Sequence, residues 1–152
     1  MRRKDREQSR DFALKVTDNS EYGVLSMVDS YGNPYCVPLS MVRDGEQLYF
    51  HCASDGQKSD CLRNNRNVCV SCVGRVKSVP EEFTTEFESA IIKGEAFEVT
   101  DKEEKIHALR LICLKYAESN MKDFDSAIKK SLDRTAIWKI TISEITGKAK
   151  IC

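Results

Sequence analysis

The chain has 152 residues, equal numbers of basic and acidic side chains, 24 of each, and a hydrophobic fraction of 41%. This length predicts one domain with a sizeable core, covering residues 1–152. The balanced charge argues against a general electrostatic grip on nucleic acid or acidic lipid, and no apolar run approaches the roughly 20 residues that span a bilayer. The N-terminus is charged rather than built around an apolar signal core, so we expect a cytoplasmic protein with neither nucleic acid nor membrane as a partner.

The first half of the chain predicts a helix followed by short strands. A helix is expected over residues 3–18, strands over 22–28, 35–42, 47–52 and 68–73, and a short helix over 58–64. The polar stretch at 30–34 and the Asp44-Gly45 turn separate the first three strands. Turns of this kind predict an antiparallel meander.

The second half predicts a long strand, two helical segments and a closing strand. The long strand covers residues 87–99, and Gly94 within it indicates a bulge. Residues 100–103 form a capping box for a helix, a second helical piece covers 124–131, and the last strand covers 136–142. Because the βαβ alternation of a parallel sheet is missing, we expect a mainly β, antiparallel α+β fold, a small barrel with flanking helices.

The seven cysteines are expected to be free thiols, since their number is odd and no secretion signal accompanies them. Cys69 and Cys72 have the spacing of half a zinc site. No second half follows, and neither His51 nor His107 stands at a finger-like interval. The β-branched residues around this pair favour buried core cysteines, so we predict no metal site.

The strongest functional signal lies in residues 48–64. Strand alternation delivers His51 to the end of a strand on its more polar face; a loop with Ser54 and Gly56 follows, and Lys58 opens a helical turn. Free amides at a helix start and a nearby ammonium make a plausible anion cradle, which indicates a phosphorylated cofactor. The alternatives are a structurally hydrogen-bonded histidine and an ordinary surface lysine.

No nucleotide-binding or hydrolase motif accompanies this cradle. Neither a Walker motif, a dinucleotide fingerprint nor a Gly-x-Ser-x-Gly elbow occurs, so we assign no catalytic side chain and expect a cofactor to carry any chemistry. Trp138, the one tryptophan, is either a core anchor or a wall against a planar ligand, and periodicity does not separate these roles.

The order of these elements resembles the flavin-binding split-barrel superfamily that includes pyridoxamine 5'-phosphate oxidase, and most closely its branch of nitroimidazole-resistance proteins. The resemblance extends over nearly the whole chain. It is carried by Tyr35-Cys-Val-Pro-Leu-Ser40, Leu48-Tyr-Phe-His51, Gly56-Gln-Lys58, Leu62-Arg63-Asn64, Glu88-Ser89 and Arg134-Thr-Ala-Ile-Trp138.

The resemblance implies a homodimer that holds two FMN molecules at its interface, with FAD as the other flavin to consider. It implies that the strand ending at Ser40 follows the isoalloxazine ring through backbone groups, and that His51, Ser54 and Lys58 hold the phosphate. Ser89 and Trp138 match positions near the flavin, with the partner subunit as their source. The cofactor-binding set implied in this way is Val37, Pro38, Leu39, Ser40, Phe50, His51, Ser54, Lys58, Ser89 and Trp138.

The implied function is an FMN-dependent oxidoreductase that acts on a small molecule and reduces nitroaromatic compounds. Gln57 stands where the oxidase has an arginine, and the C-terminal strand lacks counterparts of its substrate-phosphate residues, so pyridoxamine phosphate is not expected as the substrate. The alternatives are a flavin-binding protein without turnover, acting as carrier, sensor or scavenger, and a cofactor-free dimer with a structural barrel.

Overall fold

The computed structural model describes residues 2–151. Its helices are α1 (Arg10–Asn19), α2 (Gln57–Asn64), α3 (Lys102–Tyr116) and α4 (Phe124–Ser131), with short 3-10 turns at Lys4–Arg6, Pro80–Glu82, Glu118–Asp123 and Leu132–Arg134. Its strands are β1 (Glu7–Gln8), β2 (Gly23–Val28), β3 (Pro34–Leu39), β4 (Val42–Asp44), β5 (Gln47–Ala53), β6 (Asn67–Val79), β7 (Thr84–Glu98) and β8 (Thr135–Lys150).

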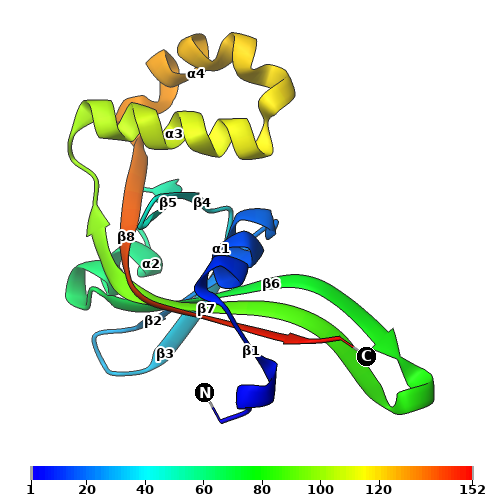
Figure 1. Ribbon diagram of the computed structural model, residues 1–152. Helices are drawn as coiled ribbons and strands as arrows, with labels where there is room; N and C mark the ends of the chain where they lie inside the picture. The colour runs from blue at the N-terminus through cyan, green and yellow to red at the C-terminus, as the bar shows by residue number, and fades with distance from the viewer. Residues whose placement is uncertain (1, 152) are drawn as a thin grey trace.

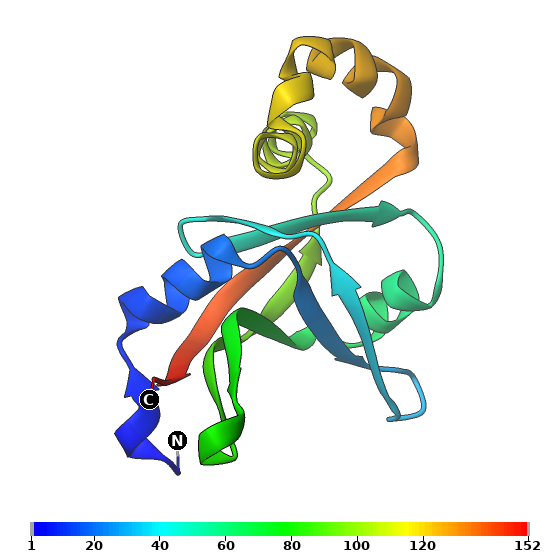
Figure 2. The same cartoon turned by 90° about the vertical axis from the view of Figure 1, so that its right-hand side faces the viewer.

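The strands form one antiparallel sheet in the order β3-β2-β6-β7-β8-β5-β4, with β1 paired to β8. β3 and β4 are the first and last strands in this order, yet only Ser40 and Met41 connect them. The sheet must therefore curl until its two ends meet, and Figure 2 shows β3 and β5 diverging from this corner. No hydrogen-bonded ladder joins the two ends within residues 2–151, so the barrel is split, as the fold class predicted.

The predicted meander is wrong in its order, because β2–β3 and β4–β5 form separate hairpins that do not pair with each other. The single strand expected over residues 35–42 is broken at Ser40 and Met41. The alternation of polar and apolar residues does not indicate this corner at Ser40 and Met41, because the residues on both sides of it are extended. The helix expected from residue 3 begins at Arg10, where the Ser9 hydroxyl accepts a hydrogen bond from the Phe12 amide at 3.2 Å.

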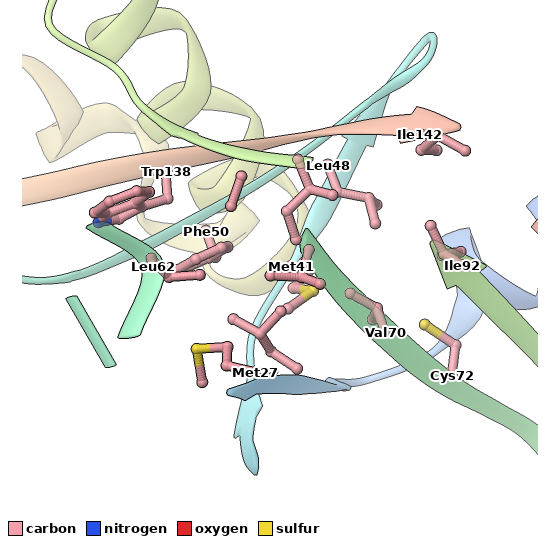
Figure 3. Packing of buried hydrophobic residues seen from close by; sticks show 14 of the residues in the cluster. Met27, Met41, Leu48, Phe50, Leu62, Val70, Cys72, Ile92, Trp138 and Ile142 are labelled. Atoms are coloured by element: carbon pink, nitrogen blue, oxygen red, sulfur yellow. The ribbon is translucent and has the colours of Figure 1, made fainter. Parts of the chain in front are cut away.

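Two hydrophobic clusters lie on opposite faces of the curled sheet. The inner cluster fills the barrel and includes Phe50, Leu62, Met41 and Trp138, whose packing Figure 3 shows. The second cluster lies outside β5 and β8, where α3 and α4 form a helical cap that covers Tyr49 and Ile137 and is visible above the strands in Figure 1. Alternate residues of one strand therefore face the barrel core and the cap.

The predicted bulge at Gly94 is confirmed, and it explains why β8 is longer than predicted. The β7–β8 register pairs Lys93 with Glu144 and Gly94 with Ile142, so Ser143 is the extra residue. A side chain at Gly94 would collide with the backbone carbonyl of Thr141. The bulge reverses the alternation of β8, which hid its continuation from Ile142 to Lys150 in the sequence pattern.

The cysteines of the described chain are free thiols, as predicted, while Cys152 lies outside the described residues. Cys72 is buried and Cys69 is half-buried on the same strand, and their spacing of three residues turns them to opposite faces. They therefore cannot bind one metal ion together. No helix within residues 2–151 is long and apolar enough to cross a membrane.

Candidate cofactor site

The split of the barrel is bounded by two strand edges that lack strand partners within residues 2–151. β3 pairs only with β2, which leaves its other edge open. β5 pairs with β8 along its whole length but with β4 only as far as Tyr49, so residues 50–53 have one open edge. Backbone amides and carbonyls on such edges require partners from water or from a ligand. The opening therefore offers a row of hydrogen-bonding groups to a polar, extended molecule.

The β4–β5 register shows which predicted residues lie near each other at this opening. Val42 pairs with Tyr49, and continuing the ladder by two residues would set Ser40 opposite His51. The corner after β3 therefore lies next to the part of β5 that begins at Phe50, where the ladder with β4 ends.

His51 lies on the outer face of β5 and remains exposed. Partial burial lowers the pKa of its imidazole, and the positive charge of Lys58 lowers this pKa further. His51 is therefore neutral at pH 7 and close enough to Lys58 for the two groups to interact electrostatically. A dianionic phosphate bound between them would reverse this effect by stabilising the imidazolium form.

The loop after β5 ends in a helix start with open amides. Gly56 is the N-cap of α2, adopts φ +132°, and offers no side-chain cap to the first amides of the helix. An L side chain strains this backbone conformation, which explains a glycine there. The Arg63 guanidinium donates to the carbonyl oxygen of Ser54 at 3.1 Å and lies 3.4 Å from a Glu98 carboxylate oxygen, which ties the loop to α2 and β7.

Lys58 is half-buried, with its ammonium 5.8 Å from the centroid of the Phe50 ring. Phe50 itself is fully buried and belongs to the barrel core. Of the predicted residues, Val37, Pro38 and Leu39 lie on β3, whose free edge borders the opening, and Ser40 lies at the corner that follows. His51 lies on β5 beyond the ladder with β4, and Ser54 and Lys58 lie in the loop and the helix that follow β5. The side chains of Val37 and Leu39 pack against the barrel core.

Trp138 and Ser89 do not lie at this opening in one chain. Trp138 is only 2% exposed and packs with Phe50 and Leu62 (Figure 3), and both edges of its strand are paired. It has the role of a core anchor, and its indole Nε1 is buried without a hydrogen-bond partner in the described chain. Ser89 lies on β7 between Val73 and Lys148. Its neighbour Ala90 pairs with Gly147 on the face that α1 covers, so Ser89 lies on the opposite face of the sheet.

A cavity of about 250 Å³ adjoins the site beneath the helical cap. His51 and Thr135 line it from the sheet, and Cys113, Phe124 and other residues line it from α3 and α4. Its lining is mainly apolar, with the imidazole among its few polar groups. No pattern in the sequence indicates this cavity, because the residues of β5 and of the cap are distant in the chain.

Comparison with known proteins places this geometry in a defined class. An antiparallel sheet that curls into a split barrel and leaves two strand edges open defines a split-barrel protein. Residues 9–149 match the family described as pyridoxamine 5'-phosphate oxidase, and the chain belongs to this family. A search of curated proteins gives no significant match.

Solved structures show the same fold. A candidate 5-nitroimidazole antibiotic resistance protein from Bacteroides thetaiotaomicron is 25% identical, with a TM-score of 0.78 over 93% of this chain and 84% of that chain. An FAD-binding protein from Mesorhizobium loti is 20% identical, with a TM-score of 0.71 over 96% of this chain and 98% of that chain. An FAD- and haem-binding protein from Mycobacterium smegmatis is 17% identical, with a TM-score of 0.82 over 97% and 74% of the two chains.

Proposed function

We propose that the protein binds a flavin mononucleotide in the split of the barrel. The observation that carries the proposal is the pair of open strand edges with an uncapped helix start and Lys58 at one end. The edges of β3 and β5 suit the amide-like rim of an isoalloxazine ring, while the α2 amides, Ser54, His51 and Lys58 suit a phosphate. The family membership and the FAD-binding proteins among the structural relatives support a flavin.

The activity we propose is reduction of a small molecule, with nitroaromatic compounds as the first class to test. A bound flavin accepts and returns electrons, including as hydride. The chain's own part is to hold the ring through backbone groups, to neutralise the phosphate with Lys58, and to exclude water with the cap. The resemblance to a candidate 5-nitroimidazole resistance protein supports this substrate class.

A flavin-binding protein without turnover is the second candidate function. It is favoured by the absence of an evident acid and base pair among the described residues that we assign to the opening, where His51 and Lys58 are the titratable side chains. Such a protein would serve as a carrier, a sensor or a scavenger of flavin.

We propose that the protein acts as a homodimer through the face of β2, β6 and β7 that lies opposite α1. On this outer face Val24, Ser71 and Ile91 form one cross-strand row, and Val73 is 54% exposed beside Ser89. Small and apolar residues on an open sheet face suit a second copy of the chain, and a partner would bring its Ser89 towards the flavin. Sedimentation equilibrium should give twice the 17.3 kDa of one chain.

The proposal is tested first by the absorbance spectrum of the purified protein and the mass of the compound that heating releases. A flavin spectrum with the mass of FMN is the expected result, and a colourless protein that also fails to bind added FMN or FAD would refute flavin binding. Steady-state reduction of a nitroimidazole by a reduced donor then separates the two functions, because a pure binder forms no more product than free flavin does.

A further inference from the structure

The end of helix α3 holds the corner between β3 and β4 through its side chains. The Tyr116 hydroxyl donates a hydrogen bond to the carbonyl oxygen of Met41 at 2.8 Å and accepts one from the Met41 amide at 3.0 Å. The Lys115 ammonium donates to the same carbonyl oxygen at 3.0 Å. Both backbone polar groups of Met41 are therefore satisfied by residues some 75 positions away in the chain.

Met41 is fixed from both sides at this corner. Its side chain is 4% exposed and belongs to the barrel core, where Figure 3 shows it among the buried residues, while its backbone faces the end of α3. Ser40, the last residue of the proposed ring-binding segment, is its immediate neighbour. A shift of the Met41 peptide must therefore move the edge of the split.

The helix that makes these contacts is itself held at its other end. Glu104, in the first turn of α3, accepts hydrogen bonds from the Tyr49 hydroxyl at 3.0 Å and from the Lys139 ammonium at 2.7 Å. These partners lie on β5 and β8, so α3 is attached to the sheet at both ends. The helix thus acts as a rigid brace between the outer face of the sheet and the corner.

We propose that Tyr116 is a positioning residue for the flavin, acting through the Met41 backbone to fix the edge of the split along which the ring is bound. The inference rests on the proposed flavin binding and adds a residue that does not itself touch the flavin. A tyrosine is suited to this role because one hydroxyl both donates and accepts, as a neighbouring peptide would. Tyr116→Phe leaves the Met41 amide without its acceptor and the carbonyl with Lys115 alone.

The test compares FMN binding by the wild-type chain, Tyr116→Phe and the matched control Tyr31→Phe. Tyr31 is 89% exposed at a turn, and its hydroxyl makes no hydrogen bond within the described chain. The control therefore removes a tyrosine hydroxyl without removing a hydrogen bond. Flavin fluorescence gives the Kd, and visible circular dichroism at saturating FMN reports the surroundings of the bound ring. Urea unfolding without FMN gives the stability of each variant.

For Tyr116→Phe we expect the Kd for FMN to rise about tenfold and the circular dichroism of the saturated protein to change, because an unsatisfied amide disturbs the ring edge. Tyr31→Phe should change neither quantity. Lys115→Met, which keeps the hydroxyl, should raise the Kd by only about two- to threefold, and it serves as the second variant if Tyr116→Phe does not fold.

The outcomes separate this inference from flavin binding itself. A wild-type chain that binds neither FMN nor FAD refutes both proposals. A wild-type chain that binds FMN, with Tyr116→Phe identical in Kd and in spectrum, refutes only the positioning role. A higher Kd with an unchanged saturated spectrum, matched by an equal loss of folding stability, would show a general structural role instead and would also overturn the inference.

Discussion

Replacing Lys58 by methionine tests the proposed phosphate cradle directly. The Lys58 ammonium lies 5.8 Å from the centroid of the Phe50 ring. The substitution removes this charge but keeps an unbranched side chain of similar length near the ring. A hydrogen bond to a charged group contributes about 1.5–3 kcal/mol, and the half-buried position of Lys58 favours the lower part of that range. We therefore expect the Kd for FMN to rise about 10- to 30-fold.

The effect should depend on pH because Lys58 lowers the pKa of His51. In Lys58→Met the imidazole loses this repulsion and becomes protonated more readily as the pH falls, so it replaces part of the lost charge. The ratio of variant to wild-type Kd should therefore be larger at pH 8 than at pH 6. Fluorescence titrations with FMN at the two pH values measure this ratio.

Riboflavin, which lacks the phosphate, provides the internal control for this variant. Its Kd should be the same for wild type and for Lys58→Met. Lys15→Met, an exposed lysine on α1, should bind both flavins as the wild type does. Equal weakening of FMN and riboflavin in Lys58→Met, or no weakening of either, would refute the assignment of Lys58 to the phosphate.

Three further predictions concern other parts of the structure. His51→Ala should weaken FMN binding. Without flavin, the folded pKa of His51 lies below 6.5, so the unfolded wild-type chain takes up the proton first and wild-type stability falls as the pH drops. His51→Ala should remove this contribution, and urea unfolding of both proteins at pH 7.5 and 5.5 measures it. Gly94→Ala should lower the free energy of unfolding by about 3 kcal/mol through its backbone collision, whereas Gly32→Ala, with φ +86° and open space around it, should cost about 1 kcal/mol; equal losses would contradict the bulge geometry. Tyr49→Phe should remove a tyrosine that ionises well above its ordinary pKa of 10.0, since burial first and its bond to Glu104 next raise the pKa of Tyr49 to about 12. An unchanged spectrophotometric titration would contradict this.

The sequence predicted the elements whose signals are local. Helix α4 has the predicted bounds, α2 and β5 differ from prediction by one residue at one end, and Gly94 marked the bulge. Alternation along β5 assigned Phe50 to the core and His51 to the opposite face. These features depend on residues within a few positions of one another, so local sequence patterns predict them.

The arrangement of the site was decided by the tertiary structure. Whether Trp138 faces the core or a ligand depends on which face of β8 the barrel encloses, and the alternation of β8 is interrupted by Ser143. The open edges of β3 and β5 exist only because the sheet curls and fails to close at Met41, and the hydroxyl that holds this corner comes from Tyr116. Strand partners and long-range hydrogen bonds join distant parts of the chain, and no local periodicity specifies which parts they will be.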